Sequence, residues 1–497
     1  MAITDAPAQT QHRDARIMQY GTPSLLVGDV LRAAAARHPN RVAVAMGERE
    51  RTFQQIAEES QHLAALLISH GVGRGARLAW WADTCLEAIP LYFACAHVGA
   101  MFVPLNPRYT DAEGRAVLDF AEPALVLTDK GRCGHETLDR FRNSRADPVT
   151  LPFIDEKDPL AMFFTSGTTG QPKGCVLSHR TERLRAGPGS PWPVGPTICT
   201  FPQFHMAGWA YLLGTWLSGD RMVLVPRADA ESLIDAVQRH RASFMYCIPA
   251  VWRRILDADR SRCDLSSLRR ADTGTSATSE ELLRGIRAAF PHATTSVVYG
   301  STEASMGCTL GPEDIFRKPG SIGPPAPGVQ ARVDASGEFW LRTPLLFSGY
   351  FRDESATRAT IVDGWYRTGE TARCDEDGYY YLTGRVKDLI RTGGETVAPA
   401  EIDAVLQTHP SLADAAVAGM PDDQWGQVLT AFVVLRPGHA IDLAELRRFC
   451  QERLAPHKYP RRLVVVEAIP RTGATGQVQR GNLLQSIGQV SDHRLPT

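Results

Sequence analysis

Apolar residues recur along this chain with the spacing of alternating helices and strands. From Leu25 to His38 and from Thr52 to His70 they fall three or four positions apart, as on one face of a helix. Each segment precedes a short apolar run that is typical of a buried strand, Val42 to Met46 and Ala76 to Trp81. Helix–strand pairs return at 233–240 with 244–246 and at 280–289 with 296–299. This alternation predicts an α/β fold with parallel sheets that are covered by helices.

The most hydrophobic stretch, Ala88 to Leu105, has nearly the length of a membrane-spanning helix. Two prolines, His97 and a glycine interrupt it. The interruptions favour a buried helix that ends at His97, followed by a strand from Ala100 to Val103. We therefore expect no membrane span.

The pattern changes after about residue 320. Short alternating strands such as Gln330 to Val333 and Glu338 to Leu341 are separated by Gly and Asp turns, which predicts a β-rich subdomain at about 320–383. After a charged segment at 384–388, helix and strand patterns form a compact α+β unit. We expect a large N-terminal domain at 1–383, a hinge at 384–388 and a small C-terminal domain at 389–497.

Composition and charge narrow the class of protein. Apolar residues make up 43% and charged residues 22% of the 497 positions, as in globular enzymes. With a net charge of −1, the chain lacks the excess of positive charge that is typical of nucleic-acid-binding proteins. It also lacks a polybasic segment that would bind a membrane surface. The ten cysteines contain no Cys-x-x-Cys pair, which argues against a zinc site and for reduced thiols. The first twenty residues lack the apolar core of a signal peptide, so we expect a cytoplasmic protein.

The segment from Thr165 to Gly174 combines four hydroxyl side chains, three glycines and Lys173, directly after the apolar run Ala161 to Phe164. Glycines let a backbone approach a ligand closely, and successive N–H groups and hydroxyls line an anion. Lys173 adds a mobile positive charge. The Walker A spacing is absent. A flexible surface turn would not explain the strand, the Ser/Thr cluster and the lysine together, so the segment predicts a polyphosphate site.

Four further segments carry side chains that suit a nucleotide and its partner substrate. Tyr299 to Glu303 ends a strand, where α/β sheets bind ligands, and offers a ring, a hydroxyl and a carboxylate for Mg²⁺. Glu370 follows a Thr-Gly turn and suits the ribose hydroxyls. Arg385 and Lys387 lie at the domain junction, and His205 lies in an aromatic segment. Taken alone, each has an ordinary interpretation as a turn acid, a charged linker or a buried histidine.

With these segments in this order, the chain resembles the adenylate-forming superfamily of acyl-CoA synthetases, peptide-synthetase adenylation domains and luciferases. The resemblance runs from about Leu25 to Leu484 and rests on Thr165–Gly174, Phe204-His205, Tyr299–Glu303, Arg367–Glu370 and Gly384–Ile402, with Val103–Pro107 also similar. It implies a large N-terminal α/β domain and a small, mobile α+β lid. It also implies that an acid and Mg·ATP form an acyl-adenylate and pyrophosphate, after which an acceptor, often coenzyme A, takes the acyl group.

The resemblance assigns a role to each matched residue. The β- and γ-phosphates are expected at Thr165, Ser166, Gly167, Thr168, Thr169, Gly170 and Lys173, with Thr169 also near the metal. Adenine is expected at Gly274, Thr275, Ser276 and Tyr299, ribose at Glu370 and Arg385, the α-phosphate at Thr302 and Mg²⁺ at Glu303, with Gly300 also in the nucleotide site. The acid is expected beside His205 and Trp209, the acceptor path beside Gly393 and Gly394, and the hinge at Asp388. The expected catalytic positions are Thr302, Glu303, His205, Lys173 and Gln477.

Three positions depart from the family pattern. Glu370 stands where the family has aspartate, so a carboxylate is kept but its geometry shifts. The adenine loop at 274–277 is an unusual version. Gln477 stands where the family has a lysine that bridges the carboxylate and the α-phosphate. A neutral amide cannot make this charge-assisted contact, and losing such a contact in a transition state costs about 10²–10³ in rate.

Gln477 leaves several functions open. Arg480, Lys458 or another cation could replace the lysine, or the residue could have been changed to trap a complex. The main hypothesis is ATP-dependent adenylation of a small, aromatic or medium-sized acid, followed by transfer to coenzyme A. The alternatives are nitrite activation as in family-like diazotases, transfer to an amine or carrier protein, and a non-catalytic nucleotide-binding sensor. The expected partner is therefore a small acid or oxyanion, with a homodimer left open.

Overall fold

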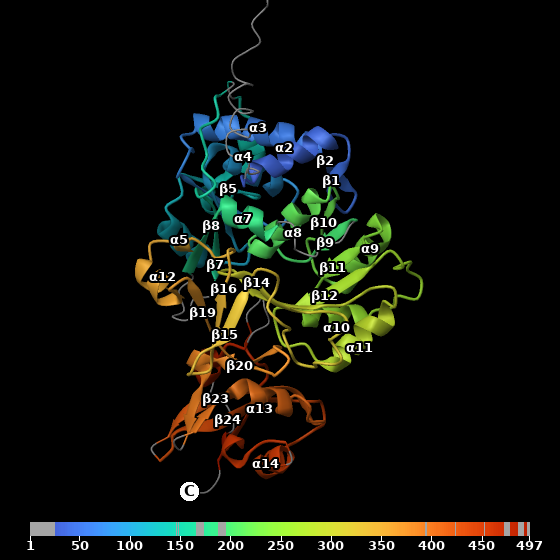
Figure 1. The fold of residues 1–497 in the computed structure, drawn as a ribbon, viewed down its shortest axis with the longest axis vertical. Helices are drawn as coiled ribbons and strands as arrows, with labels where there is room; N and C mark the ends of the chain where they lie inside the picture. Colours follow the sequence, from blue (N-terminus) through green and yellow to red (C-terminus); the bar gives the residue numbers. More distant parts are fainter. Residues whose placement is uncertain are drawn as a thin grey trace, which may run out of the picture.

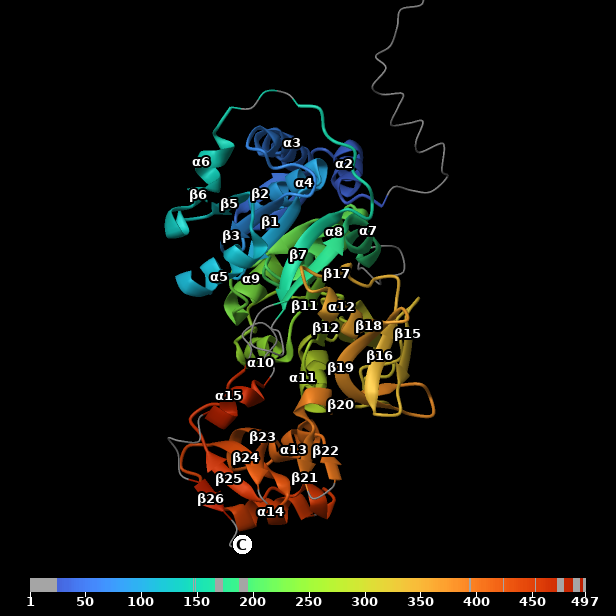
Figure 2. The same ribbon diagram turned by 90° about the vertical axis from the view of Figure 1, so that its left-hand side faces the viewer.

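The computed structural model describes residues 25–145, 147, 149–165, 173–186, 195–392, 395–422, 424–451, 453–471, 478–485 and 492–494 (Figure 1). These residues form two large sheets in the N-terminal part, a smaller sheet after residue 320 and a separate C-terminal sheet. The C-terminal unit lies at one end of the molecule, next to strand β20 (Tyr380–Arg385) (Figure 2).

The first sheet has seven strands and carries the candidate phosphate segment. Their order is β17 (Gly349–Tyr350), β8 (Lys173–Ser178), β7 (Pro159–Thr165), β4 (Met101–Leu105), β3 (Arg77–Trp81), β5 (Leu125–Thr128) and β6 (Glu136–Thr137). β7 and β8 are antiparallel, and Thr165 pairs with Lys173 at the end of their ladder. The two ends of the candidate phosphate segment are thereby held side by side.

The second sheet has eight strands and supplies the opposite part of the site. Their order is β14 (Ser305–Leu310), β13 (Val297–Ser301), β12 (Arg270–Gly274), β11 (Phe244–Tyr246), β9 (Thr197–Cys199), β10 (Met222–Leu224), β1 (Val42–Met46) and β2 (Arg49–Thr52). The strands from β13 to β1 are parallel, whereas β14 and β2 are antiparallel edges. The prediction of parallel sheets is therefore wrong at the edges, because connections of a few residues allow only antiparallel hairpins.

Two smaller sheets complete the chain. After residue 320, β15 (Gln330–Val333), β16 (Glu338–Arg342), β19 (Trp365–Cys374), β18 (Ile361–Val362) and β20 form an antiparallel sheet. The C-terminal sheet contains β22 (Glu395–Val397), β21 (Ile390–Thr392), β24 (Gly426–Leu435), β25 (Arg462–Val465), β26 (Asp492–Arg494) and β23 (Leu412–Asp422). A large α/β part with a β-rich section and a small α+β part is the predicted fold class.

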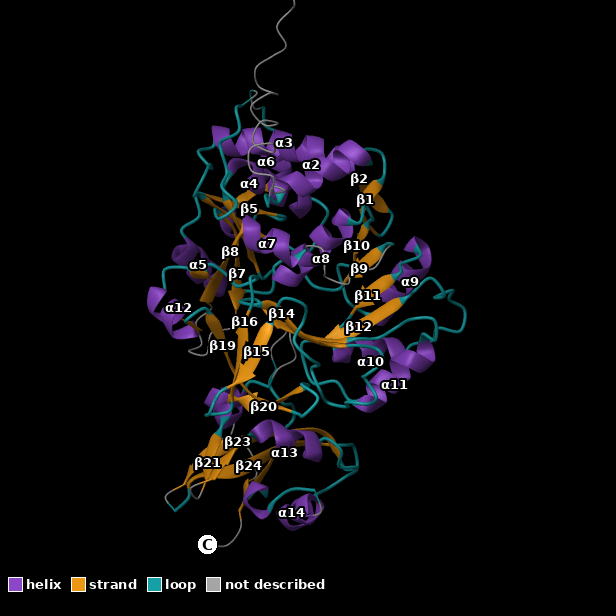
Figure 3. Cartoon of the chain, viewed as in Figure 1, coloured by secondary structure: helices purple, strands orange, loops and turns teal. Residues whose placement is uncertain are grey.

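Helices pack against these sheets (Figure 3). They are α2 (Gly28–Arg37), α3 (Phe53–Ser69), α4 (Ala88–Val98), α5 (Asp111–Ala121), α6 (Leu138–Arg142), α7 (His179–Arg185), α8 (Met206–Leu217), α9 (Ala230–His240), α10 (Pro249–Asp257), α11 (Glu280–Ala289), α12 (Glu354–Thr360), α13 (Pro399–Leu406), α14 (Leu443–Gln451) and α15 (Arg480–Gln485). Short 3₁₀ turns occur at Arg132–Gly134, Val386–Asp388 and Pro456–Lys458. The predicted strands 42–46, 244–246 and 330–333 and the helix 280–289 have the observed bounds.

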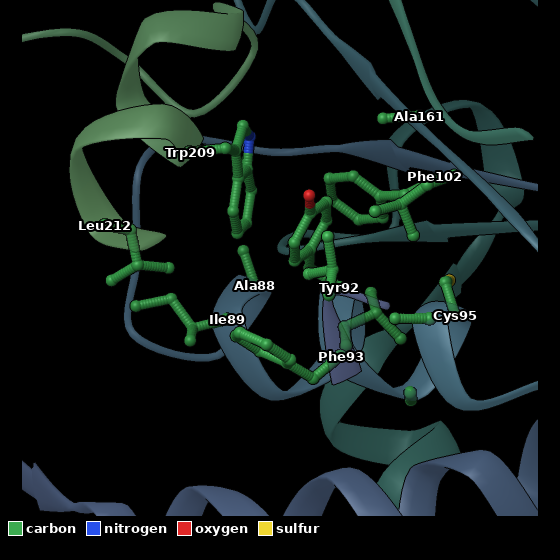
Figure 4. Packing of buried hydrophobic residues seen from close by; sticks show 14 of the residues in the cluster. Ala88, Ile89, Tyr92, Phe93, Cys95, Phe102, Ala161, Trp209 and Leu212 are labelled. Carbon is green, nitrogen blue, oxygen red and sulfur yellow. The ribbon is translucent and has the colours of Figure 1, made fainter. Parts of the chain in front are cut away.

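The hydrophobic stretch that begins at Ala88 lies inside the protein. All residues of α4 except His97 are buried, and Gly99 ends the helix in the left-handed conformation before β4 begins. Figure 4 shows Tyr92 of α4 packed between Phe102 and Trp209. The buried helix and strand predicted here are confirmed. In the part of the chain that the structure describes, no helix is long and apolar enough to cross a membrane.

Candidate active site

A cavity of about 830 Å³ lies where the two large sheets and the β-rich sheet meet. It collects residues that are far apart in the sequence, from the ends of β7, β12, β13 and β19 and from the segment after β20. The predicted site residues in its lining are Thr165, Lys173, His205, Thr275, Tyr299, Gly300, Thr302, Glu303, Glu370 and Arg385. Residues 166–170, 393, 394 and 477, which carry other predicted roles, lie outside the described residues.

Two glycines let the strands approach each other at the predicted adenine position. A Cβ on Gly274, whose φ is +154°, would lie 2.0 Å from the carbonyl oxygen of Val298. A Cβ on Gly300 would lie 2.3 Å from the carbonyl oxygen of Ser305. Thr275 also has a positive φ of 71°, and its Oγ1 lies 2.9 Å from the hydroxyl of Tyr246. Only glycine fits at the first two positions, so the shape of this wall follows directly from the sequence.

Thr302 and Glu303 lie in the tight turn between β13 and β14. Arg185 of α7 holds this turn, because its Nη2 donates hydrogen bonds to the carbonyl oxygens of Thr302, at 2.9 Å, and Glu303, at 3.4 Å. Glu303 is 9% exposed and lines the cavity, and its carboxylate accepts a hydrogen bond of 2.9 Å from the hydroxyl of Tyr350. Lys173 lies over the Tyr350 ring, with Nζ 4.8 Å from its centroid. The turn thus carries a carboxylate, and the cation of Lys173 lies over the tyrosine ring that bonds this carboxylate.

The carboxylate predicted for ribose is built into the wall beside the predicted adenine position. Glu370 accepts a 2.5 Å hydrogen bond from the hydroxyl of Tyr299, and its other oxygen lies 4.0 Å from the Arg385 guanidinium. Burial raises the pKa of Glu370, although Tyr299 and Arg385 both oppose this. Glu370 and Arg385 are also Cα partners in the β19–β20 ladder. The extra methylene of glutamate, compared with aspartate, is what carries the carboxylate to the Tyr299 hydroxyl.

We expect Glu370→Asp to raise KM for ATP about tenfold. The shorter side chain loses the hydrogen bond to Tyr299, and a hydrogen bond to a charged group is worth about 1.5 kcal/mol. Steady-state kinetics at varied ATP measure this effect. Tyr299→Phe removes the same hydrogen bond and is expected to raise KM by a similar factor. A lower KM in Glu370→Asp would show that this contact does not shape the nucleotide site.

His205 begins α8 at the apolar side of the cavity. Its Nδ1 accepts a hydrogen bond of 3.2 Å from the N–H of Ala207, and its ring stacks on Phe201 with centroids 5.1 Å apart. Burial lowers the pKa of His205 to about 4, so the imidazole is neutral near pH 7. With Nδ1 as acceptor, the ring carries its proton on Nε2. His205 is therefore a neutral donor at the boundary between the polar and apolar parts of the cavity.

Trp209 lies in the core and does not line the cavity, so its predicted contact with substrate is wrong. It is 1% exposed, stacks on Tyr92 at 4.2 Å and donates a 2.8 Å hydrogen bond from Nε1 to the carbonyl oxygen of Gln203 (Figure 4). Successive residues of a helix are rotated by about 100° around its axis, so Ala207 and Ala210 can line the cavity while Trp209 points into the core.

Trp209→Ala is therefore expected to lower the free energy of unfolding by about 3–5 kcal/mol. KM for the acid should change less than about threefold in the folded variant, because Trp209 lies outside the cavity lining. Urea unfolding and steady-state kinetics measure the two quantities. Leu217→Ala, at an exposed position of the same helix, is the control and should cost about 0.5 kcal/mol or less. A large rise in KM with unchanged stability would restore the predicted substrate contact.

The lid residues considered as replacements for the missing lysine are engaged elsewhere. Arg480 forms ion pairs with Asp388, at 3.2 Å, and with Asp403. Lys458 pairs with Glu401 at 2.7 Å. Neither lines the cavity, whereas Lys387 does, and burial lowers its pKa. The predicted hinge Asp388 is thus tied to α15 through Arg480.

Several residues of the site had no predicted role, among them Arg185 and Tyr246. Arg185 is fully buried under the Thr302–Glu303 turn, and Tyr246 lines the cavity beside Thr275. The helical pattern around Arg185 resembles an ordinary charged surface helix, and Tyr246 was predicted only as part of a strand. The position of Tyr246 at the carboxyl end of a predicted parallel strand could have indicated its place in the site, because α/β sheets bind ligands at that edge.

The residues of the cavity fit a magnesium ion that is bound together with phosphate. Among the described residues, no group of three or more His, Cys, Asp or Glu could hold a metal by itself. Glu303 offers one carboxylate in the cavity, next to Thr302. Mg²⁺ usually binds through one or two carboxylates plus substrate phosphates and water. The donor set is therefore suitable for a metal–nucleotide complex rather than for a permanent metal centre.

Comparison with known proteins identifies the family. Two family models match the chain, "AMP-binding enzyme" over residues 31–351 and "AMP-binding enzyme C-terminal domain" over residues 401–475. The chain belongs to the AMP-binding enzyme family. Among curated members of this family, the indoleacetate–CoA ligase of Aromatoleum aromaticum is 31% identical over 500 residues, covering 92% of this chain and 97% of the relative. The 2-succinylbenzoate–CoA ligase of Bacillus cereus is 33% identical over 476 residues, covering 91% and 97%.

Solved structures of AMP-binding enzymes share the whole fold. The o-succinylbenzoate CoA synthetase of Bacillus subtilis in complex with its acyl-adenylate intermediate has a TM-score of 0.83 at 27% identity, covering 91% of this chain and 97% of that chain. The same enzyme in complex with ATP and a magnesium ion has a TM-score of 0.83 at 27% identity, covering 92% and 99%. The adenylate-forming family expected from the motifs is confirmed, and the chain is an enzyme of the AMP-forming acid–CoA ligase type. Nitrite activation, transfer to an amine or carrier protein and a sensor role are not favoured.

Proposed function

We propose that this AMP-forming ligase activates an aromatic acid with Mg·ATP and then transfers the acyl group to coenzyme A. The observation that carries the proposal is one cavity with two different halves. The polar half contains Thr302, Glu303 and the Glu370–Arg385 pair. The apolar half contains His205 and aromatic side chains. A single cavity of this kind suits two substrates that must react with each other in a fixed orientation.

The residues of the polar half are assigned by their chemistry. Attack of a carboxylate on the α-phosphate needs alignment and charge neutralisation more than covalent help. We assign the Thr302 hydroxyl to the α-phosphate and Lys173 to the terminal phosphates. Glu370 and Arg385 are assigned to ribose, and Tyr299 and the Gly274–Thr275 turn to adenine. Glu303 is assigned to hold Mg²⁺, which would supply positive charge to the phosphates.

His205 is assigned to the acid. A neutral imidazole with its proton on Nε2 donates a hydrogen bond to a carboxylate without forming a full ion pair. The carboxylate therefore stays a nucleophile while its direction is fixed. The predicted hinge at Asp388 and the predicted acceptor path at Gly393 and Gly394 belong to the second step, in which the lid changes position.

A cytoplasmic location is part of the proposal. All ten cysteines are free thiols, as expected in a reducing compartment. Burial raises the pKa of several of them, for example Cys85 to about 12 and Cys199 to about 12. These thiols are structural rather than reactive. The predicted homodimer remains a prediction.

A pyrophosphate-release assay with ATP and Mg²⁺ tests the proposal. Aromatic acids, aliphatic acids of similar size and nitrite with an arylamine are compared, each with and without coenzyme A. Release with aromatic acids, together with a thioester detected by mass spectrometry, is the expected result. Release only with nitrite would overturn the proposal in favour of diazotisation. Adenylate formation without thioester would overturn the acceptor, and no release with any substrate would favour a sensor.

Gln477→Lys is expected to raise acid-dependent turnover by about tenfold or more. The restored charge supplies part of the 10²–10³ that one transition-state contact is worth. Single-turnover measurement of adenylate formation separates this effect from lid motion. Gln479→Lys, two positions along the same segment, is the matched control and should change turnover little. Unchanged turnover in Gln477→Lys would mean that this chain does not use position 477 for adenylation.

A further inference from the structure

Two neighbouring strands present aromatic and charged side chains to the apolar half of the cavity. In the parallel β11–β12 pair, Phe244 is the Cα partner of Arg270 and Tyr246 is the partner of Asp272. Side chains two residues apart on a strand share one face of the sheet, and all four of these side chains line the cavity. The floor of the acid site thus combines two aromatic rings with a charged pair.

The opposite wall of the acid site is formed by α8. Ala207, Ala210 and Tyr211 line the cavity from this helix. The Tyr211 ring stacks on Phe244 with centroids 5.5 Å apart and lies 5.9 Å from the Tyr246 centroid. Two alanines on the helix leave room over a floor of flat rings, so the site suits a planar aromatic group.

Arg270 and Asp272 neutralise each other in the floor of this slot. The Arg270 Nη2 lies 2.6 Å from the Asp272 Oδ2, and the side chains are 16% and 2% exposed. Asp272 Oδ1 also accepts a 3.0 Å hydrogen bond from the N–H of Ser296, which fixes its orientation. The pair contributes no net charge. A second carboxylate on the substrate would therefore find no net positive charge to compensate for its desolvation, because the Arg270 charge is already neutralised by Asp272.

The position of the pair matches the far edge of an aromatic acid. At about 3.3 Å per residue, Asp272 lies about 7 Å and Arg270 about 13 Å along β12 from Gly274, where the strand reaches the predicted nucleotide half. An acid with its carboxylate beside His205 and one ring in the slot would point its distal edge toward the Arg270–Asp272 pair.

We propose that the substrate is an aromatic monoacid whose distal ring edge carries a neutral hydrogen-bond donor, a hydroxyl or an amino group, recognised by the Arg270–Asp272 pair. A phenol donates to the Asp272 carboxylate and accepts from the Arg270 guanidinium, and an aniline donates to Asp272. This inference rests on the proposed function and names its substrate class. An unsubstituted ring makes no hydrogen bond to the Arg270–Asp272 pair. It also displaces water from the pair, so these buried polar groups lose hydrogen bonds that the ring does not replace.

The test compares acids that differ only at the distal edge. Phenylacetate, its 3- and 4-hydroxy and amino derivatives and 4-carboxyphenylacetate are assayed by pyrophosphate release, and the series is repeated on benzoate and cinnamate frameworks. In at least one framework we expect kcat/KM for a hydroxy or amino acid to exceed that of the unsubstituted acid by about 10² or more. The dicarboxylate should be the poorest substrate of that framework.

A double variant tests the assignment to this pair. Arg270→Met with Asp272→Asn removes both charges but keeps an amide oxygen for the Ser296 N–H. The preference for the substituted acid should fall at least tenfold, while KM for ATP stays within about threefold. Arg284→Met, which breaks an exposed pair with Glu280 on α11, is the matched control and should leave the preference unchanged. If the double variant does not fold, the preference for the substituted acid is measured in Asp272→Asn alone.

The outcomes separate this inference from the proposed function. The inference is overturned if kcat/KM for the unsubstituted and substituted acids agrees within about threefold, or if the dicarboxylate has the highest kcat/KM. Either result leaves the ligase proposal intact. A preference that persists in the double variant also overturns it, because another part of the cavity then recognises the substituent. Absence of pyrophosphate with every acid overturns the proposed function and this inference together.

Discussion

Glu303→Gln is expected to lower kcat for acid-dependent pyrophosphate release by about 10²–10³, the range observed when one electrostatic contact to a transition state is removed. Glutamine has the shape of glutamate and can still accept the hydrogen bond from the Tyr350 hydroxyl, which is 2.9 Å long in the wild type. What it lacks is the negative charge that we assign to the magnesium ion. The loss should therefore appear in kcat and in the concentration of Mg²⁺ needed for half-maximal activity.

Two measurements distinguish this effect from a structural one. Urea unfolding should show that Glu303→Gln is as stable as the wild type or more so, since burying a neutral amide costs less than burying a carboxylate. Tyr350→Phe keeps the carboxylate and loses only the hydrogen bond, so its kcat should fall about tenfold or less. Wild-type activity in Glu303→Gln would contradict the assignment of the metal to this residue.

The parts of the site that could be predicted from the sequence are those where local geometry demands a particular residue. Gly274 and Gly300 leave no room for a Cβ, Glu303 lies in the short turn between β13 and β14, and Glu370 lies within β19 directly after Gly369, which has a positive φ. Such positions keep their residue types in a recognisable order along the chain, which is why widely separated motifs predicted one nucleotide site. The same reasoning predicted the α4–β4 stretch, where only a buried helix and strand fit the interrupted apolar run.

The errors arise where tertiary packing decides which face of an element meets the ligand. Trp209 and Ala210 are neighbours on α8, yet the first packs on Tyr92 in the core and the second lines the cavity. The apolar character of α8 all around its axis gave no indication of the cavity face. Likewise, the Arg270–Asp272 pair forms part of the cavity only because β11 and β12 are adjacent, which is a property of the sheet order.

Arg185 illustrates the same limit for charged residues, and its removal is expected to affect both stability and activity strongly. Its Nη2 and Nε donate to the carbonyl oxygen of Leu345, at 2.9 and 3.3 Å, in addition to the two carbonyls of the Thr302–Glu303 turn. Glu182 lies 4.0 Å from its guanidinium, and both side chains are fully buried. Arg185→Met removes the donor that these carbonyl oxygens share and leaves the buried Glu182 carboxylate without a cation, which should lower the free energy of unfolding by about 3–5 kcal/mol.

The pH dependence of this loss identifies its cause. Burial raises the pKa of Glu182 from 4.5 to about 7, and Arg185 opposes this rise. Because the folded-state pKa lies above the unfolded value, the stabilisation from protonated Glu182 is complete below about pH 4.5 and is lost as the pH rises through 7. Without Arg185 the folded pKa rises further. The defect of Arg185→Met should therefore be smaller at pH 5.5 than at pH 8.5.

Urea unfolding at the two pH values, together with kcat measurements, completes this test. Glu182→Gln combined with Arg185→Met should recover most of the pH-dependent part of the loss, because no buried carboxylate remains. The unsupported Thr302–Glu303 turn should still lower kcat in the double variant, while KM for ATP changes less. Arg180→Met, at an exposed position of α7, breaks the ion pair with Glu156 of the turn before β7 and should cost about 0.5 kcal/mol or less. An Arg185→Met enzyme with wild-type kcat would show that the backbone of the turn keeps its position without the arginine.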